Sequence, residues 1–168
     1  GMNFVAGLIL MHLEEDSAFC VLVMLMDVCC LRGMYLPDMA LLQLRLKLLT
    51  RLIQIHAPRL AEHLEAAGAD VMIFASPWLL GIFSSEFTVN FSGRVMDMVL
   101  HYRSYSVVMR ACLALLLESE EELLQKEDFE SIFCFLKSEI PLWSRDKLNK
   151  VSLQEDERRG VWAGWWMP

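Results

Sequence analysis

The sequence predicts an all-α fold, an array of several helices joined by short connections. In successive segments of the 168-residue chain, apolar residues recur at spacings of three and four, and no segment shows the alternation of a half-buried strand. Residues that begin or end helices, such as aspartate, proline and glycine, separate these segments. The hydrophobic fraction of 55% is enough for a substantial core. We therefore expect one all-helical domain without internal repeats.

The chain opens with two segments that are nearly apolar all round. The first covers residues 1–13, and the second runs from residue 17 to about residue 31. Asp16 can cap the second helix, and Gly33 can end it. Because neither segment has a wide polar face, we expect both helices to lie inside the protein.

The third and fourth helices are expected to be amphipathic. Pro37 and Asp38 open the third helix, while Pro58 occupies a first-turn position of the fourth, which ends at Gly68. The expected buried stripe of the third helix consists of Leu41, Leu44, Leu48, Leu52 and Ile55. Its expected solvent side consists of Gln43, Lys47, Arg51 and Gln54.

The central segment covers residues 71–83 and carries no charge. Asp70 can cap a helix that begins there. Pro77 removes an amide donor and crowds the carbonyl of Ile73, so we expect the helix to bend beside Trp78 or to split in two. A segment that is apolar all round should be surrounded by protein. We therefore expect Trp78 to be more than half buried.

The second half of the chain predicts further helices. An amphipathic helix should bury Phe91, Val95, Met98, Val99 and Tyr102 and expose Asn90, Arg94, Asp97 and His101. Residues 105–118 have one charged residue before the closing glutamate and should be internal. Ser119 and Glu122 match a capping box, and Asp128 can begin a last helix that Pro141 ends. The expected stripe of that helix is Phe129, Ile132, Phe133, Leu136 and Ile140.

Charge and cysteine content restrict the class of protein. A net charge of −7 with scattered basic residues argues against a nucleic-acid surface. No apolar run reaches the ~18 residues of a membrane span, and the apolar opening lacks the basic leader of a signal peptide. We expect reduced, buried thiols in a cytoplasmic protein. The cysteines are Cys20, Cys29, Cys30, Cys112 and Cys134.

The composition changes near the end of the chain. Charged residues come after Trp143, and a segment rich in tryptophan, glycine and proline closes the sequence. Three tryptophans within five residues suit neither a helix nor a core layer. We expect a domain over residues 1–142 and a loosely ordered tail over residues 143–168.

Motifs of common enzyme classes are absent. The sequence has no glycine-rich phosphate loop, no H-E-x-x-H and no G-x-S-x-G. His56 and His63 are seven residues apart, but Pro58 breaks the helix between them, so a shared metal ion is not expected. We expect neither a metal nor a cofactor.

Four separated segments, in order, resemble motifs of the TBC domain of Rab GTPase-activating proteins. Residues 1–7 resemble the segment that begins with Gly-Met-Asn in that family's Tyr-x-Gln-Gly-Met-Asn motif, and residues 15–19 resemble the start of its next helix. Residues 74–83 resemble its aromatic-Ala-Ser-x-Trp segment, and residues 94–97 resemble its Arg-Ile-Trp-Asp. Residues 111–124, followed by Asp128 and Phe129, are similar to its closing helices, and the similarity extends to about residue 142. Departures occur at Pro77, at Met96 and over residues 90–93.

The resemblance implies a multi-helix array like the C-terminal part of a TBC domain. It also implies a regulator of GTP-bound Rab GTPases in membrane traffic, located in the cytoplasm and peripheral to endomembranes through its partners. Such proteins donate an arginine and a glutamine to the GTPase, which itself holds the nucleotide and magnesium. In the family pattern both residues precede Gly1, so no catalytic residue is expected here. Without preceding helices, Phe4, Leu8 and Met11 should form an exposed apolar patch.

The resemblance offers Asn3, Phe74 and Trp78 as residues that line or support a GTPase-facing groove. The alternative is that Phe74 and Trp78 only pack in the core and that Asn3 only caps backbone. Two functions stay open with the family: a fragment of a Rab GTPase activator without its catalytic residues, or a helical module that binds a GTPase or another protein without stimulating hydrolysis. An unrelated helical scaffold is a third possibility.

Overall fold

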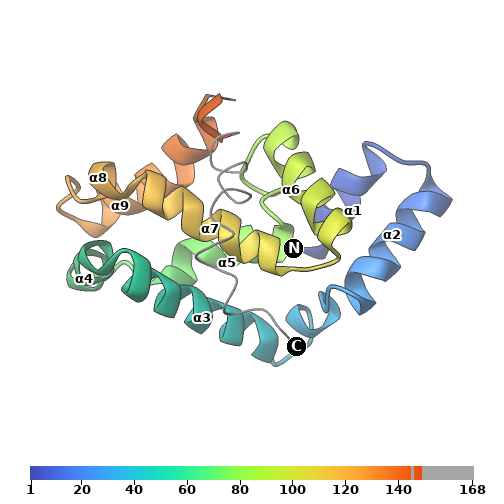
Figure 1. Ribbon diagram of the computed structural model, residues 1–168, viewed down its shortest axis with the longest axis horizontal. Helices are drawn as coiled ribbons and strands as arrows, with labels where there is room; N and C mark the ends of the chain where they lie inside the picture. Colours follow the sequence, from blue (N-terminus) through green and yellow to red (C-terminus); the bar gives the residue numbers. More distant parts are fainter. Residues whose placement is uncertain (145, 149–168) are drawn as a thin grey trace.

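A computed structural model describes residues 1–144 and 146–148 of the chain. Most of the tail expected over residues 143–168 lies outside the described residues. The described part is helical and contains no strand, which confirms the all-α prediction (Figure 1). Its α-helices are α1 (Met2–Leu10), α2 (Glu15–Asp27), α3 (Ala40–His56), α4 (Pro58–Ala66), α5 (Val71–Gly81), α6 (Val89–Tyr102), α7 (Ser106–Glu118), α8 (Glu120–Leu123) and α9 (Phe129–Cys134). A π-helical turn comes next at Phe135–Glu139, and 3-10 turns form Arg32–Met34 and Ile140–Leu142.

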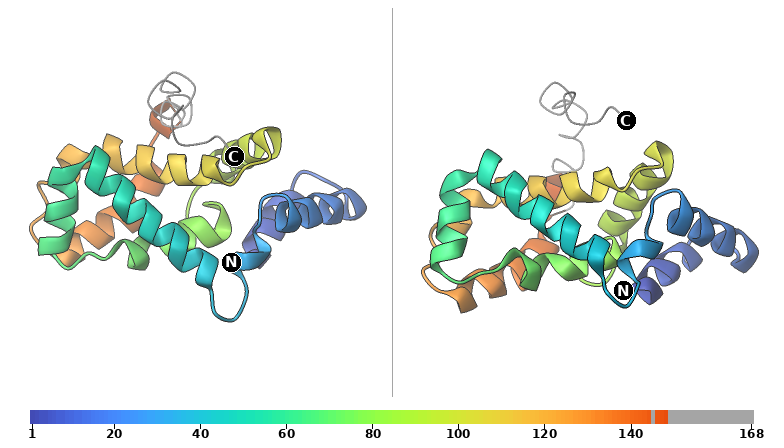
Figure 2. Two further views of the ribbon diagram at one scale, coloured as in Figure 1. Left: turned by 60° about the horizontal axis from the view of Figure 1, so that its bottom comes forward. Right: turned by 90° about the horizontal axis from the view of Figure 1, so that it is seen from below.

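Helix α5 occupies the middle of the array. It packs against α1, α3 and α7, and α6 covers α7 and contacts α1. Helices α1 and α2 pack on each other and form one end of the molecule, while α4 and α9 lie at the opposite end (Figure 2). The beginning of the chain therefore lies beside α5, near the centre of the protein (Figure 1).

Trp78 on α5 is fully buried, as the sequence predicts. Its ring centroid lies 5.5 Å from that of Phe74, 5.9 Å from that of Phe83 and 5.7 Å from that of Phe87. The indole N–H donates a 3.0 Å hydrogen bond to Glu86, so burial leaves no polar group of the ring unsatisfied.

Helix α5 confirms one local expectation, excludes one of the two alternatives given for Pro77, and contradicts a third expectation. The carboxylate of Asp70 accepts a 2.8 Å hydrogen bond from the amide of Met72, as a helix cap should. The helix is not split, because Pro77 lies inside one continuous α-helix. Nor is it surrounded, since Met72 and Ile73 are half-exposed.

Helix α3 is amphipathic, but its buried side differs from the expected one. The buried residues are Leu42, Leu46, Leu49 and Ile53. Leu44 is 62% exposed and Ile55 is also half-exposed, whereas the expected solvent side is exposed throughout. Leucines surround much of this helix, so its contacts with α5 and α7 decide which of them are buried.

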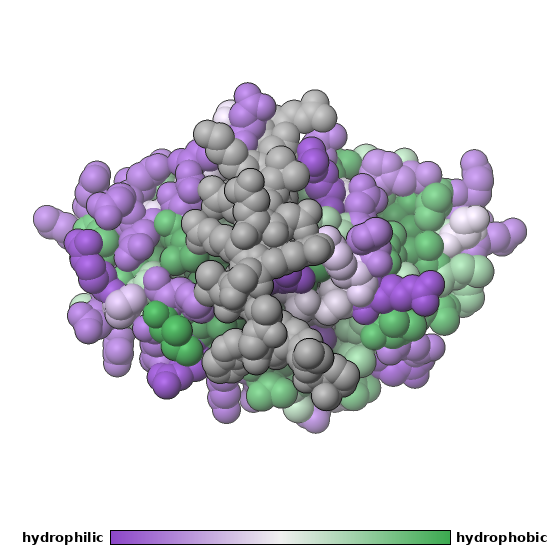
Figure 3. Space-filling view, viewed as in Figure 1, coloured by the Kyte–Doolittle hydropathy of each residue, from purple (hydrophilic) through white to green (hydrophobic). Residues whose placement is uncertain are grey.

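The expectation that both opening helices are internal is wrong. In α2 only Ala18 and Leu25 are buried, and Phe19 is 67% exposed. Asp16 does not cap this helix, which begins at Glu15 without a side-chain cap. The side of the molecule that carries α1 and α2 shows apolar surface between polar patches (Figure 3). Two neighbouring helices at one end of an array can bury only the sides that they turn toward each other and the core.

The expected apolar patch on α1 is present in part. Phe4 is 46% exposed and Met11 is 64% exposed, as expected. Leu8 is only 4% exposed, which contradicts the expectation. Leu8 is buried because it faces α6, together with Ile9.

Helices α6 and α7 follow the sequence pattern closely. The predicted polar side of α6 is exposed, and nine residues of α7 are buried. On α6, however, Met96 is buried while Tyr102 is 39% exposed. Tyr102 is the last residue of this helix, whereas Met96 lies on the side that faces Leu8 and Ile9 of α1.

The two expected helix starts after α7 have different outcomes. The hydroxyl of Ser119 does not cap α8 but donates to the carbonyls of Leu115 and Leu116 at the end of α7. Asp128 does cap α9, because its carboxylate accepts a 2.8 Å hydrogen bond from the amide of Ser131. The expected stripe of α9 and the turns after it is buried or partly buried except at Phe129, which is 39% exposed.

The five cysteines are free thiols, but only Cys29 and Cys112 are buried. Cys20, Cys30 and Cys134 are exposed, contrary to expectation. Burial raises the pKa of Cys29, and the neighbouring Cys30 raises it further. In the part of the chain that the structure describes, no helix is long and apolar enough to cross a membrane.

Replacing Trp78 with alanine should lower the free energy of unfolding by about 3–5 kcal/mol, because it leaves a large cavity among buried aromatic rings. Phe129→Ala is the matched control, since the ring of Phe129 is partly exposed and its loss should cost much less. Urea unfolding monitored by circular dichroism measures both. Equal stability of Trp78→Ala and the parent chain would contradict the central position of α5.

Candidate partner-binding site

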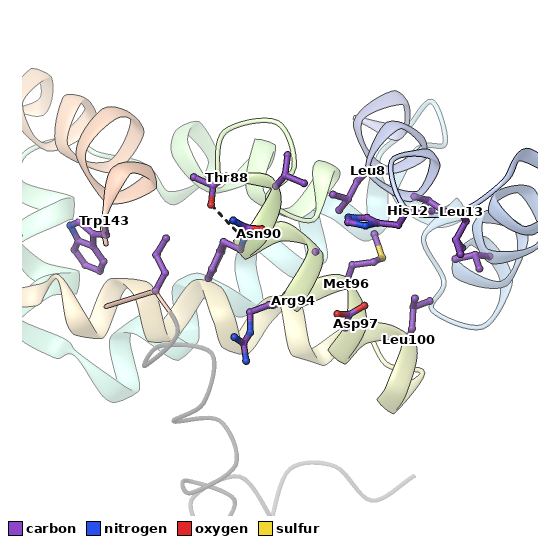
Figure 4. A pocket seen from close by; sticks show the side chains of 16 residues that line it. Leu8, His12, Leu13, Thr88, Asn90, Arg94, Met96, Asp97, Leu100 and Trp143 are labelled. Atoms are coloured by element: carbon purple, nitrogen blue, oxygen red, sulfur yellow. Dashed lines mark hydrogen bonds between the residues drawn. The ribbon is translucent and has the colours of Figure 1, made fainter. Parts of the chain in front are cut away.

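A groove of about 570 Å³ lies between α1 and α6 (Figure 4). The end of α1 and the residues after it form one wall, and α6 forms the other. Thr88 fixes the start of α6 by accepting a hydrogen bond of 3.4 Å from the amide of Phe91. Trp143 and Leu148 complete the lining at one end. We call this feature the α1–α6 groove.

The α1–α6 groove combines an apolar floor with a polar rim. Leu8, Ile9, Phe91 and Met96 are each at most 5% exposed and form much of its lining. The rim carries Asn90, Arg94 and Asp97 on α6, and His12 comes from the end of α1 (Figure 4). Apolar surface bordered by both signs of charge is typical of surfaces that contact other proteins.

The imidazole of His12 lies close to Gly93 of the facing helix. A Cβ atom at Gly93 would lie 3.7 Å from Nε2 of His12, an ordinary van der Waals distance, so the two sides of the groove approach each other here. The sequence pattern did not identify His12. It placed Arg94 and Asp97 on the exposed side of α6 but did not assign either of them to a binding site.

The structure separates the three residues that the resemblance offers as partner-binding. Phe74 and Trp78 contact each other on α5, but they are 4% and 0% exposed and lie in the core. Asn3 is exposed on the first turn of α1. None of the three lines the α1–α6 groove. Asn3 is connected to Phe74 and Trp78 only indirectly, because α1 packs against α5, the helix that carries both aromatic residues.

The end of α5, against which α1 begins, receives two tyrosine hydroxyls. Tyr35 donates a 2.6 Å hydrogen bond to the carbonyl of Leu80, and Tyr105 donates to the carbonyl of Leu79. Burial raises the pKa of Tyr35 to about 12 and raises that of Tyr105 well above its usual value. Both groups are therefore hydrogen-bond donors at neutral pH. Nothing in the sequence pattern indicates these bonds, because they join residues 45 and 26 positions apart.

Arg45 orders the surroundings of these tyrosines. Its guanidinium lies 3.6 Å from the centroid of the Tyr105 ring, and Nη2 donates a 3.3 Å hydrogen bond to the carbonyl of Cys29. Burial lowers the pKa of Arg45, while the neighbouring Tyr105 acts on it in the opposite direction. Arg45 is thus used inside the protein and is not a free cation at the surface.

The described residues offer no site for a metal ion. They contain no group of three or more histidine, cysteine, aspartate or glutamate side chains that could hold one. His63 instead lies with Nε2 2.8 Å from the carbonyl oxygen of Lys126.

Comparison with known proteins identifies the family of this chain. The sequence model of the RabGAP TBC domain matches residues 1–160. The chain is 35% identical over 154 residues to TBC1 domain family member 4 of Mus musculus, covering 92% of this chain and 12% of that protein. It is 38% identical over 141 residues to TBC1 domain family member 1 of Homo sapiens, covering 84% of this chain and 12% of that protein.

A solved structure gives the same result for the fold. The TBC domain of the Chlamydomonas flagellar RabGAP superposes with a TM-score of 0.78 at 26% identity, covering 92% of this chain and 52% of that one. The chain therefore spans about half the length of this solved domain and a small part of the curated relatives. With sequence and fold in agreement, the chain belongs to the RabGAP TBC domain family.

Proposed function

We propose that this chain is part of a GTPase-activating protein that contacts a Rab-family GTPase in its GTP-bound state. The match of the RabGAP TBC domain over residues 1–160 is the observation that carries the proposal. The two exposed features that involve α1, its first turn and the α1–α6 groove, support a role in protein contact. Such a protein would act in the cytoplasm, peripheral to endomembranes through its partners.

We assign the direct contact to Asn3 and a supporting role to Phe74 and Trp78. Asn3 is exposed, so its amide group can donate to and accept from a partner. Phe74 and Trp78 are too deeply buried to touch a partner without rearrangement. They support the contact through α5, on which α1 packs.

This chain should not accelerate hydrolysis on its own. In the family pattern the arginine and the glutamine that act on the GTPase precede the Gly-Met-Asn motif, which here is residues 1–3. A surface that binds the GTPase cannot replace groups that stabilise charge on the phosphates and position water. A module that only binds would behave in the same way, so binding and hydrolysis need separate experiments.

Asn3→Ala should weaken binding to a GTP-loaded Rab GTPase by about tenfold, the equivalent of roughly 1.4 kcal/mol. The reason is the loss of the exposed amide without any change in the core. Titration against a panel of GTP-loaded Rab proteins by biolayer interferometry measures the affinity. Gln54→Ala is the control, because it removes an exposed amide on α3, away from α1. Unchanged affinity of a folded Asn3→Ala variant would remove Asn3 from the contact.

A saturating amount of this chain should leave the rate of GTP hydrolysis by each Rab protein unchanged. Single-turnover assays with and without the chain measure the rate, and a TBC domain that carries both catalytic residues is the positive control. Stimulation of any Rab protein by about a hundredfold, approaching the range of an arginine finger, would show that the chain contains a catalytic group.

A further inference from the structure

The end of α5 has an unusual backbone. Ile82 and Phe83 have φ angles of 49° and 64°, in the left-handed region that favours glycine. Residues in this region are strained and persist only where the surroundings impose the conformation, and Ile82 is β-branched, which adds to the strain. Both side chains are fully buried, so the segment cannot relax toward solvent.

Side-chain hydroxyls hold three successive carbonyls at this point. Tyr105 donates to Leu79, Tyr35 donates to Leu80, and Ser84 donates to Gly81. Ser84 is local, but the tyrosines come from the start of α7 and from the turn before α3. The strained end of α5 is therefore held in place by two distant parts of the chain.

Gly1 lies directly on this segment. A Cβ atom at Gly1 would be 2.6 Å from Cβ of Leu80 and 3.0 Å from the carbonyl oxygen of Leu80, which is too close for any side chain. That oxygen is the one that accepts the Tyr35 hydroxyl. The carbonyl of Gly1 in turn accepts hydrogen bonds of 3.1 Å and 3.4 Å from the amides of Phe4 and Val5. One peptide group of α5 thus joins Tyr35 to the first turn of α1.

We propose that Tyr35 and Tyr105 are positioning residues for GTPase binding. They hold the neighbouring carbonyls of Leu79 and Leu80 in place, and Leu80 is the residue against which Gly1 lies. This Gly1–Leu80 contact sets the direction of the first turn of α1, which presents Asn3. The inference rests on the proposed function for its effect on the GTPase. Its mechanical part is the claim that Tyr35 holds α1 in place through Leu80. This part rests only on the contacts described above.

Tyr35→Phe tests the mechanical part, because it removes the hydroxyl and keeps the ring. Amide hydrogen exchange of Phe4 and Val5 should become about tenfold faster, while exchange in α4 stays unchanged. Ser119→Ala is the matched control, since it also removes a buried hydroxyl bonded to backbone carbonyls, but at the end of α7. Equal exchange of Phe4 and Val5 in both variants would overturn the inference.

Binding to GTP-loaded Rab proteins tests the functional part. Tyr35→Phe should weaken binding by about fivefold or more, whereas Ser119→Ala should bind like the parent chain. Faster exchange at α1 with unchanged affinity for the GTPase would overturn the positioning role. If the parent chain bound no Rab protein, the proposed function would fail, but the exchange result would still decide whether the tyrosines hold α1.

A pair of glycine variants tests the contact between Gly1 and Leu80 without removing any hydrogen-bond donor. Gly1→Ala should weaken GTPase binding as Tyr35→Phe does, because its methyl group would push α1 away from Leu80. Gly7→Ala lies on the same helix, where a Cβ atom would meet nothing within 4 Å, and should bind like the parent chain. Equal GTPase affinity of the two glycine variants would contradict the proposal that the Gly1–Leu80 contact orients α1.

Discussion

The burial of Trp78 is the interaction on which the rest of the array depends. Its ring can occupy the centre because the indole N–H donates to Glu86, whose other carboxylate oxygen lies 3.6 Å from Nζ of Lys137. This pairing puts the polar part of the ring and its partner at the border of the core. The apolar part then joins Phe83 and Phe87, so α5 can serve as the common surface for α1, α3 and α7.

The features that could be predicted from sequence are those determined within one turn of helix. Asp70 and Asp128 cap helices because each carboxylate reaches an amide two or three residues ahead. Gly68 ends a helix because its φ of 67° suits glycine. The burial of α7 was also predictable, because that helix has almost no polar residue to present to solvent.

The features that could not be predicted depend on contacts between distant segments. Helix α3 has leucines on most sides, so periodicity alone cannot distinguish Leu42 from Leu44. The same limit applies to the candidate site. Asn3 was found from a motif, but its relation to α5 depends on Tyr35, whose hydroxyl bonds to a residue 45 positions away. His12 was missed because a single histidine after an apolar helix carries no pattern.

Helix α1 contacts or faces the segments that resemble the family motifs. Residues 1–3 lie at its start against Leu80, while residues 74–83 form α5 and its strained end. Residues 94–97 lie on α6, across the groove from the other end of α1. These segments are far apart in sequence, yet each contacts or faces one short helix. The turn that presents Asn3 and one wall of the α1–α6 groove therefore belong to the same short helix, which packs on α5.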